Sequence, residues 1–212
     1  MKKSFLSIET SLNRIFLVLY IKDNLISNSK ILENSIEVDI NQMFDEILEQ
    51  AQTQFSELDY IMVSIGPGSY TGARVGLAAA KAIAVSINKP IFGYTNFSAI
   101  YNQGISDSLI KSNIKTGVII KASKYDAYSQ IIKNNVFSSY KVLSINDLNS
   151  DSLMCEKILG NYYKVDEIKN YHFCLPKKES IFKIFLKHLE NENNYKNKNL
   201  EPLYIKGHYA EK

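Results

Sequence analysis

The chain has 212 residues, of which 45% are hydrophobic and 22% charged, a composition typical of globular proteins. Its 25 basic and 22 acidic residues give a net charge of +3, too small to indicate direct binding to nucleic acid or a membrane surface. No stretch approaches the ~18 apolar residues of a membrane span, and Glu9 and Arg14 interrupt the apolar core that a signal peptide needs. Cys155 and Cys174 have no second pair for zinc. We therefore expect a soluble, cytoplasmic protein with free thiols.

The first half of the chain predicts a strand meander followed by alternating helices and strands. Three segments rich in branched and aromatic residues predict antiparallel strands at 5–9, 14–21 and 25–32. Apolar side chains in the next segment fall on one helical face, which predicts a helix over 39–55 with Asp39 as its cap. Strands are expected at 60–66 and 89–94, and helices at 72–87 and 97–105, the last capped by Thr95 or Asn96. Together these elements predict a first lobe over residues 1–105.

The second half repeats this opening weakly. Strands are predicted at 114–122, 125–133, 136–144 and 155–161, followed by an amphipathic helix over 177–193. The tail from residue 197 is expected to be irregular or partly extended. A second lobe over residues 106–212, with this helix and tail at its end, indicates an ancient duplication whose second copy has eroded.

The segment "SIGPGSYTGARVGLAAAKAIA", Ser64 to Ala84, places four glycines at the start of a predicted helix. Their spacing of 2, 4 and 4 residues matches neither the dinucleotide fingerprint G-x-G-x-x-G nor the Walker A loop. Because backbone N–H groups point outward at a helix N-terminus, a general anion site stays open as an alternative.

The same helix carries a ridge of small side chains, since Gly72, Gly76, Ala80 and Ala84 recur every four residues. Glycine inside a helix costs ~1 kcal/mol relative to alanine, so we expect a close approach at Gly76. The ridge packs either within its own lobe, on the sheet or on the 39–55 helix, or against a partner helix. Arg74 is one of two arginines in a lysine-rich chain, and it predicts a bidentate contact that lysine cannot make.

Residues able to carry catalysis are scarce. None of the three histidines has a second ligand at an established metal spacing, and nothing resembles G-x-S-x-G. The segment Glu9–Ser11 stands where actin-like ATPases carry Asp-x-Gly-Thr, but it lacks the glycine that lets the turn wrap phosphates. We therefore expect no catalytic, cofactor-binding or metal-binding residue in this chain.

Three segments together resemble one family. "LSIETS" at the start, "GPGSYTGARVG" after the fourth strand and "PLYIK" near the end resemble the TsaB family, also called YeaZ, of the bacterial machinery that makes N6-threonylcarbamoyladenosine on tRNA. The resemblance spans nearly the whole chain, and its middle segment is the most specific. It implies an α/β, two-lobed actin-like (ASKHA, RNase H-like) fold with a degenerate second lobe, and a non-catalytic role. The family usually has Asp where Glu9 stands.

The resemblance also implies partners. Members of the family pair helix to helix with TsaD, the enzyme that transfers the threonylcarbamoyl group, and the ATPase TsaE joins that pair. ATP and metal are therefore expected on the partner subunits and not in this chain. We expect the 39–55 and 72–87 helices to form the interface, and the same face to form a homodimer when TsaD is absent. The predicted interface residues are Ile40, Met43, Phe44, Ile47, Gly72, Arg74, Val75, Gly76, Ala79, Ala80 and Ile83.

Three other functions compete with this hypothesis. The first is an actin-like ATPase or small-molecule kinase with its own nucleotide site, against which the missing Asp-x-Gly counts. The second is a metallopeptidase, and the third is a dimerisation module of another pathway. The chain lacks the H-x-x-x-H arrangement that TsaD uses to bind metal, which argues against TsaD itself and against peptidase activity.

Overall fold

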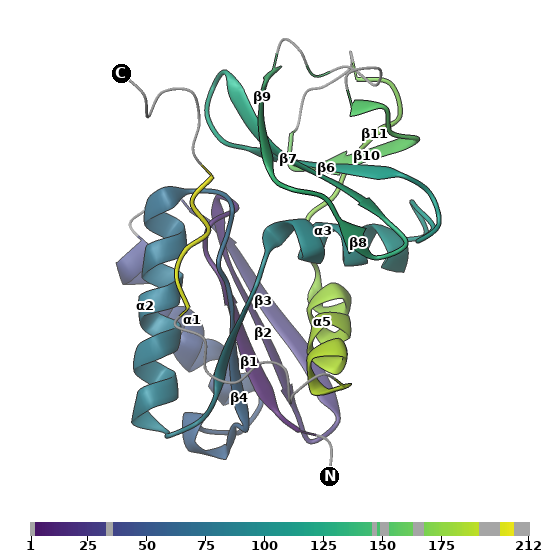
Figure 1. The fold of residues 1–212 in the computed structure, drawn as a ribbon. Coiled ribbons are helices and arrows are strands. Elements are labelled where there is room, and N and C mark those ends of the chain that lie inside the picture. The colour runs from purple at the N-terminus through teal and green to yellow at the C-terminus, as the bar shows by residue number, and fades with distance from the viewer. Residues whose placement is uncertain are drawn as a thin grey trace.

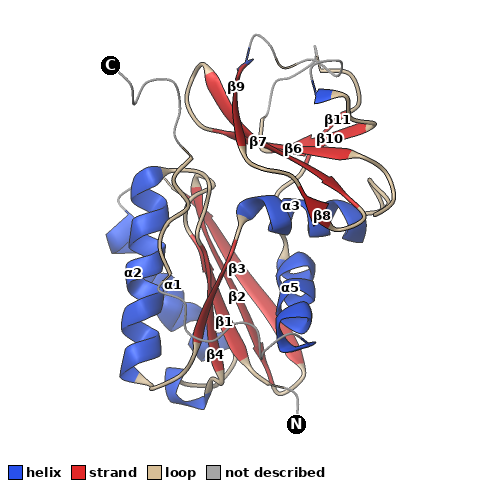
Figure 2. Ribbon diagram, in the orientation of Figure 1, coloured by secondary structure: helices blue, strands red, loops and turns tan. Residues whose placement is uncertain are grey.

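The structure is a computed structural model that describes residues 3–32, 36–145, 148, 153–162, 168–190 and 200–205. These residues form two lobes, each built on its own β-sheet (Figure 1 and Figure 2). In the part of the chain that the structure describes, every helix is too short or too polar to cross a membrane.

The sheet of the first lobe has the strand order β3-β2-β1-β4-β5. β1 pairs antiparallel with β2 and parallel with β4, so the predicted meander continues into a parallel half. Helices cover both faces, which explains why these strands are nearly continuous apolar runs. The strands are β1 (Phe5–Glu9), β2 (Arg14–Ile21), β3 (Asn24–Ile31), β4 (Tyr60–Ser64) and β5 (Ile91–Tyr94).

The helices lie in two layers on this sheet (Figure 1). α1 (Ile36–Gln50) and α2 (Tyr70–Ser86) pack on one face through a single apolar cluster with the strands. α5 (Lys178–Glu190) packs on the opposite face, where the rings of Phe5 and Phe185 have centroids 4.4 Å apart. α5 follows the second sheet in the chain but lies on the first.

The second sheet repeats the strand order of the first. The hairpin β6–β7 is antiparallel, and β10 and β11 add in parallel beside β6, as β4 and β5 do beside β1. Only ten residues connect β10 to β11, whereas 26 residues, including α2, connect β4 to β5. The strands are β6 (Thr116–Lys121), β7 (Asp126–Lys133), β8 (Val136–Phe137), β9 (Lys141–Ser144), β10 (Lys157–Gly160) and β11 (Tyr171–Phe173).

α3 (Asn96–Ser106) joins the lobes. Phe97 and Tyr101 of this helix are fully buried in a cluster with Leu12 of the first lobe and with Val118 and Leu159 of the second sheet. The predicted division of the chain at residue 105 falls at the end of this helix and stays a prediction. The two sheets share an apolar core around α3.

Several local predictions differ from the structure. Asp39 does not cap α1, because the helix begins at Ile36 and the Asp39 carboxylate is buried, accepting a hydrogen bond from Lys30 Nζ at 2.7 Å. The predicted end of that helix is a turn followed by a short 3-10 helix at Phe55–Glu57. The strand predicted over 136–144 is interrupted between β8 and β9, and β11 was not predicted. Residues 206–212 of the predicted tail lie outside the described residues.

The predicted helix starts in the first lobe agree better with the structure. Thr95 caps α3 as one of the two expected residues, its side chain accepting the N–H of Ser98 at 3.1 Å. α2 begins two residues before the predicted start at 72, and its cap, which was not predicted, is Ser69, whose side chain accepts the N–H of Gly72 at 3.2 Å.

Candidate partner interface

The small ridge of α2 faces the chain's own lobe. Gly72 and Gly76 are buried, and a Cβ atom built on Gly72 would lie 2.1 Å from the carbonyl oxygen of Thr10. A Cβ atom on Gly76 would lie 2.3 Å from Thr10 Oγ1, which donates a hydrogen bond to the carbonyl of Gly72 at 2.7 Å. The ridge therefore packs within its own lobe and not against a partner helix. The approach expected at Gly76 is made by the turn between β1 and β2, and not by a surface that a partner could reach.

The apolar stripe of α1 is also part of the core. Ile40, Met43, Phe44 and Ile47 are at most 6% exposed and face the first sheet. These residues, together with Gly72, Gly76 and Ala80, hold the two helices in place but do not line their outer surface. The predicted residues that reach the surface are Arg74, which is exposed, and Val75, Ala79 and Ile83, which are half-buried. Their role as interface residues stays a prediction.

The outer surface of α1 is acidic. The helix contains five acidic residues and no basic one, and four of the five carboxylates are exposed. Val38 lies on the same outer side and is 70% exposed. The exposed acidic residues are Glu37, Asp45, Glu46 and Glu49.

The outer surface of α2 is small and mostly uncharged. Ala78, Ala82 and Val85 are exposed, Val85 to 80%, while Val75 and Ile83 pack at the edge of the core. Because Ala78, Ala82 and Val85 are four and three positions apart, they lie on one accessible face of the helix. The sequence prediction missed these outer residues, since it took the buried apolar stripe of each helix for the contact surface.

Arg74 lies at one end of α2 between two tyrosines of its own chain. Its guanidinium group lies 3.8 Å from the ring centroid of Tyr70, and its Nε donates a hydrogen bond to the Tyr204 hydroxyl at 2.8 Å. Both rings are about half exposed. The structure thus has a stacked contact where the sequence predicted a bidentate one, and both depend on the flat guanidinium that lysine lacks.

The partner of Arg74 comes from residues 200–205, here called the C-terminal strap. The strap is fixed by the N–H of Leu203, which donates to the carbonyl of Ile65 at 2.7 Å. Leu200 packs on the core of the first lobe, and Ile205 packs on the cluster shared by the two lobes. The strap therefore runs along the first lobe to the boundary between the sheets (Figure 1).

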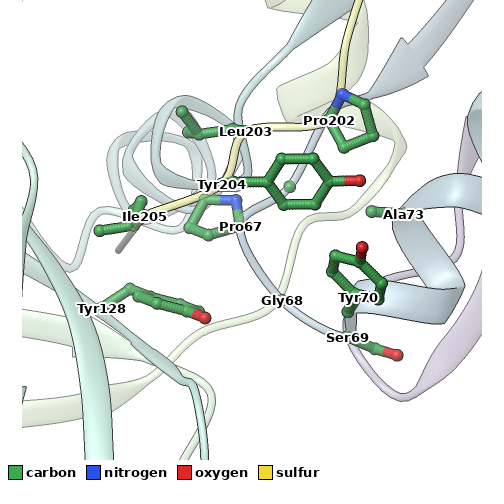
Figure 3. Close-up of a pocket in the computed structure, with 11 residues that line it drawn as sticks. Pro67, Gly68, Ser69, Tyr70, Ala73, Tyr128, Pro202, Leu203, Tyr204 and Ile205 are labelled. Atoms are coloured by element: carbon green, nitrogen blue, oxygen red, sulfur yellow. The ribbon is translucent and has the colours of Figure 1, made fainter. Parts of the chain in front are cut away.

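A cavity of about 160 Å³ lies between the strap and residues 66–69, here called the glycine loop. Figure 3 shows strap residues along one side and Tyr128 of the second sheet opposite them. The cavity is smaller than the ~300–1,000 Å³ of typical ligand pockets. It is lined by Gly66, Pro67, Gly68, Ser69, Tyr70, Ala73, Tyr128, Pro202, Leu203, Tyr204 and Ile205.

The turn between β1 and β2, where actin-like ATPases hold phosphate, is occupied by a carboxylate of its own. Glu9 Oε1 accepts hydrogen bonds from the N–H groups of Ser11 at 2.6 Å and Leu12 at 3.1 Å, and from the Ser11 hydroxyl at 2.9 Å. The glycine loop closes over the same turn, because a Cβ atom on Gly68 would lie 2.3 Å from the Ser11 carbonyl oxygen. These backbone donors are therefore used inside the chain.

Glu9 is fully buried, and this burial raises the pKa of its carboxyl above the ordinary value. Arg14 opposes the shift, with its Nε 3.9 Å from Glu9 Oε2, as do the hydrogen bonds from Ser11 and Leu12. The Asn96 side chain joins the turn to the loop by donating to Ser11 Oγ at 2.7 Å and to the Pro67 carbonyl at 2.9 Å.

The described histidines lie far from this turn in different surroundings. His188 is buried and stacks on Phe92 with ring centroids 3.7 Å apart. Burial and the neighbouring Lys157 lower the pKa of His172. Among the residues that the structure describes, no three His, Cys, Asp or Glu side chains are grouped to hold a metal ion. His208 lies outside them.

The repeated strand order and the paired lobes define an α/β protein with a two-lobed actin-like fold. Two solved structures from Pseudomonas aeruginosa share it. One is described as a protein with similarity to peptidase YEAZ, with a TM-score of 0.78, 14% identity, and coverage of 97% of this chain and 100% of that chain. The other is YeaZ, with a TM-score of 0.76, 14% identity, and coverage of 96% and 100%.

Sequence comparisons show which proteins with this fold the chain is similar to. The chain is 25% identical to the tRNA threonylcarbamoyladenosine biosynthesis protein TsaB of Buchnera aphidicola subsp. Acyrthosiphon pisum (strain APS), over 91% of this chain and 93% of that protein. It is 29% identical to TsaB of Buchnera aphidicola subsp. Schizaphis graminum (strain Sg), over 47% and 48%. The model of the family "TsaD: tRNA N6-adenosine threonylcarbamoyltransferase" matches residues 30–111. The chain is thus similar to proteins named TsaB or YeaZ over nearly its whole length.

Proposed function

We propose that this chain is a non-catalytic subunit in the formation of N6-threonylcarbamoyladenosine on tRNA, and that it binds TsaD through the outer surface of α1 and α2. The observation that carries the proposal is the accessible apolar face of α2, with Ala78, Ala82 and Val85 exposed on a helix rigidly packed on its sheet. The relatives named TsaB, and the TsaD model that matches residues 30–111, support the pathway and the partner.

The closed turn at Glu9 supports the absence of a nucleotide site in this chain. The N–H groups that would wrap a phosphate are bonded to the Glu9 carboxylate, and the glycine loop covers them. In this proposal ATP and metal belong to TsaD and to TsaE, which joins the pair. The same face also allows a homodimer, weaker than the complex with TsaD, when TsaD is absent. In this proposal tRNA is bound by the complex and not by this chain alone.

Binding to TsaD tests the proposal. The purified chain is titrated with the TsaD protein of the same cell, and the dissociation constant is measured for wild type and for Ala78→Arg. Arginine at this exposed position leaves the fold intact, and we expect at least tenfold weaker binding because a charge enters the apolar centre of the interface. Val136→Arg, 71% exposed on β8, is the matched control and keeps wild-type affinity.

A result with no binding between wild-type protein and TsaD would overturn the proposal. The competing ATPase or kinase function is tested separately by calorimetry of the lone chain with ATP and Mg²⁺. Stoichiometric binding there would favour that second candidate.

A further inference from the structure

The outer surface of α1 and α2 divides into two zones of different chemistry. The α1 zone carries four exposed carboxylates, those of Glu37, Asp45, Glu46 and Glu49, and the helix has no lysine or arginine. The α2 zone carries the exposed uncharged side chains of Ala78, Ala82 and Val85. The only basic residues of α2 are Arg74, which is held by two tyrosines, and the half-buried Lys81.

This acidic zone contrasts with the chain as a whole, whose net charge is +3. The carboxylates are not placed there to pair with α2, because the only exposed charge on α2 is Arg74 at its far end. Within the described part of the chain, the one α1 carboxylate with a lysine partner is Asp39, which is buried and pairs with Lys30. A helix surface of one sign favours partners of the opposite sign and disfavours partners of the same sign.

We propose that this surface selects a partner whose docking face carries lysine or arginine over α1 and small apolar side chains over α2, and that the α1 carboxylates discriminate against a second copy of this chain. The inference rests on the proposed function and specifies the chemistry of the face that TsaD presents. If two copies docked through this surface with their α1 helices facing each other, two rows of carboxylates would meet, and α1 and α2 together contain only Arg74 and Lys81 as basic residues.

The different chemistry of the two zones lets one surface provide both affinity for a partner and selection among partners. The small side chains of α2 allow a partner helix to approach closely and bury apolar area. The carboxylates of α1 lie at the rim, where charges act mainly on association rate and on the choice of partner. Both effects weaken as salt screens the charges, since the Debye length falls from about 14 Å at 0.05 M to about 4 Å at 0.5 M.

The test measures affinity for TsaD at 50 mM and 500 mM NaCl with three forms of the full chain. The forms are wild type, the double variant Asp45→Lys/Glu49→Lys on α1, and the control Glu179→Lys/Glu190→Lys, which makes the same change of net charge at exposed positions of α5. We expect the α1 variant to bind about tenfold more weakly at 50 mM NaCl, as for the loss and reversal of two rim charge pairs. The difference shrinks to about twofold at 500 mM, and the control stays near wild type at both.

Self-association, measured by sedimentation for the same three forms without TsaD, supplies the second arm. Wild-type self-association becomes stronger with salt, whereas the complex with TsaD becomes weaker.

Equal affinity of the α1 variant and wild type for TsaD at 50 mM overturns the inference while leaving the proposed function in place. Loss of TsaD binding in all forms, wild type included, overturns the proposed function. An equal loss in the α1 variant and the α5 control assigns the effect to net charge and also overturns the inference.

Discussion

Gly76 is the position where a single side chain decides the packing of α2. Thr10 Oγ1 occupies the space that a Cβ atom would take, and it is held there by its hydrogen bond to the Gly72 carbonyl. Glycine costs helix stability, and this cost is offset by bringing the helix against the β1–β2 turn.

We therefore expect Gly76→Ala to lower the free energy of unfolding by about 1–2 kcal/mol, because overpacking by one methyl exceeds the ~1 kcal/mol that alanine gains in a helix. Chemical denaturation measures the change. In a Thr10→Ala background the nearest remaining atom, Cβ of residue 10, lies 3.5 Å away, so the same substitution becomes neutral or stabilising. A loss of equal size in both backgrounds would show that Thr10 is not the obstacle.

Glu9 gives a second prediction at the residue scale. Because burial raises its pKa above the ordinary value of 4.5, the folded protein holds the Glu9 proton at pH values where the unfolded chain has released it. Stability contributed by this group is present below pH 4.5 and is lost as the pH rises through the folded pKa. Glu9→Gln does not titrate, so the melting temperature of wild type is expected to fall relative to this variant as the pH rises from 4 to 7. Parallel pH profiles, measured by thermal denaturation, would contradict the direction of the shift, and a relative gain by wild type would mean that Arg14 outweighs burial.

At the scale of elements, the C-terminal strap depends on α2 for its position. Arg74 lies on Tyr70 and bonds Tyr204, so one helix residue fixes a segment 130 residues away in the chain. The strap in turn places Leu203 against the end of β4, beside the glycine loop.

We expect Arg74→Lys to loosen the strap without unfolding the protein, because lysine offers neither the flat stacking surface nor the Nε donor. Hydrogen exchange measures this loosening of the strap. The amide of Leu203 is expected to exchange several-fold faster in the variant, while the amides of β4 keep their wild-type rates. Lys81→Arg, on the same helix, is the control and leaves Leu203 unchanged. Unchanged exchange at Leu203 in Arg74→Lys would mean that the strap is held by its other contacts.

At the scale of the whole molecule, the lobes exchange helices. α3 follows the first sheet and packs its aromatic residues on the second, whereas α5 follows the second sheet and packs on the first. The shared cluster around Phe97 and Tyr101 therefore couples the two lobes.

Calorimetry of the wild-type chain is expected to show a single unfolding transition, because neither lobe keeps its core when the other unfolds. Phe97→Ala is expected to destabilise the whole protein by about 3–5 kcal/mol and to move that transition without splitting it. Two resolved transitions in wild type would show that the lobes unfold independently.

The local patterns of the sequence were enough for much of the fold and for the family. Branched and aromatic runs predicted the opening meander, and Thr95 was one of two expected caps because such a hydrogen bond closes within three residues. The sequence also predicted that something approaches Gly76 closely, since glycine in a helix needs a reason. Such signals are readable because the interacting groups are neighbours in the chain or repeat at a fixed period.

Only the tertiary structure decided which surfaces are free for a partner. Helical periodicity identifies an apolar stripe but not whether a sheet of the same chain covers it, and here the sheet covers the α1 stripe and the Thr10 turn covers the α2 ridge. The contact of Arg74 with Tyr204 and the packing of α5 on the first sheet could not be predicted, because they join residues far apart in the chain and have no period. The sequence by itself predicted most of the strands and helices and the resemblance to the TsaB (YeaZ) family, and tertiary packing decided that the outer residues of α1 and α2 are the ones exposed.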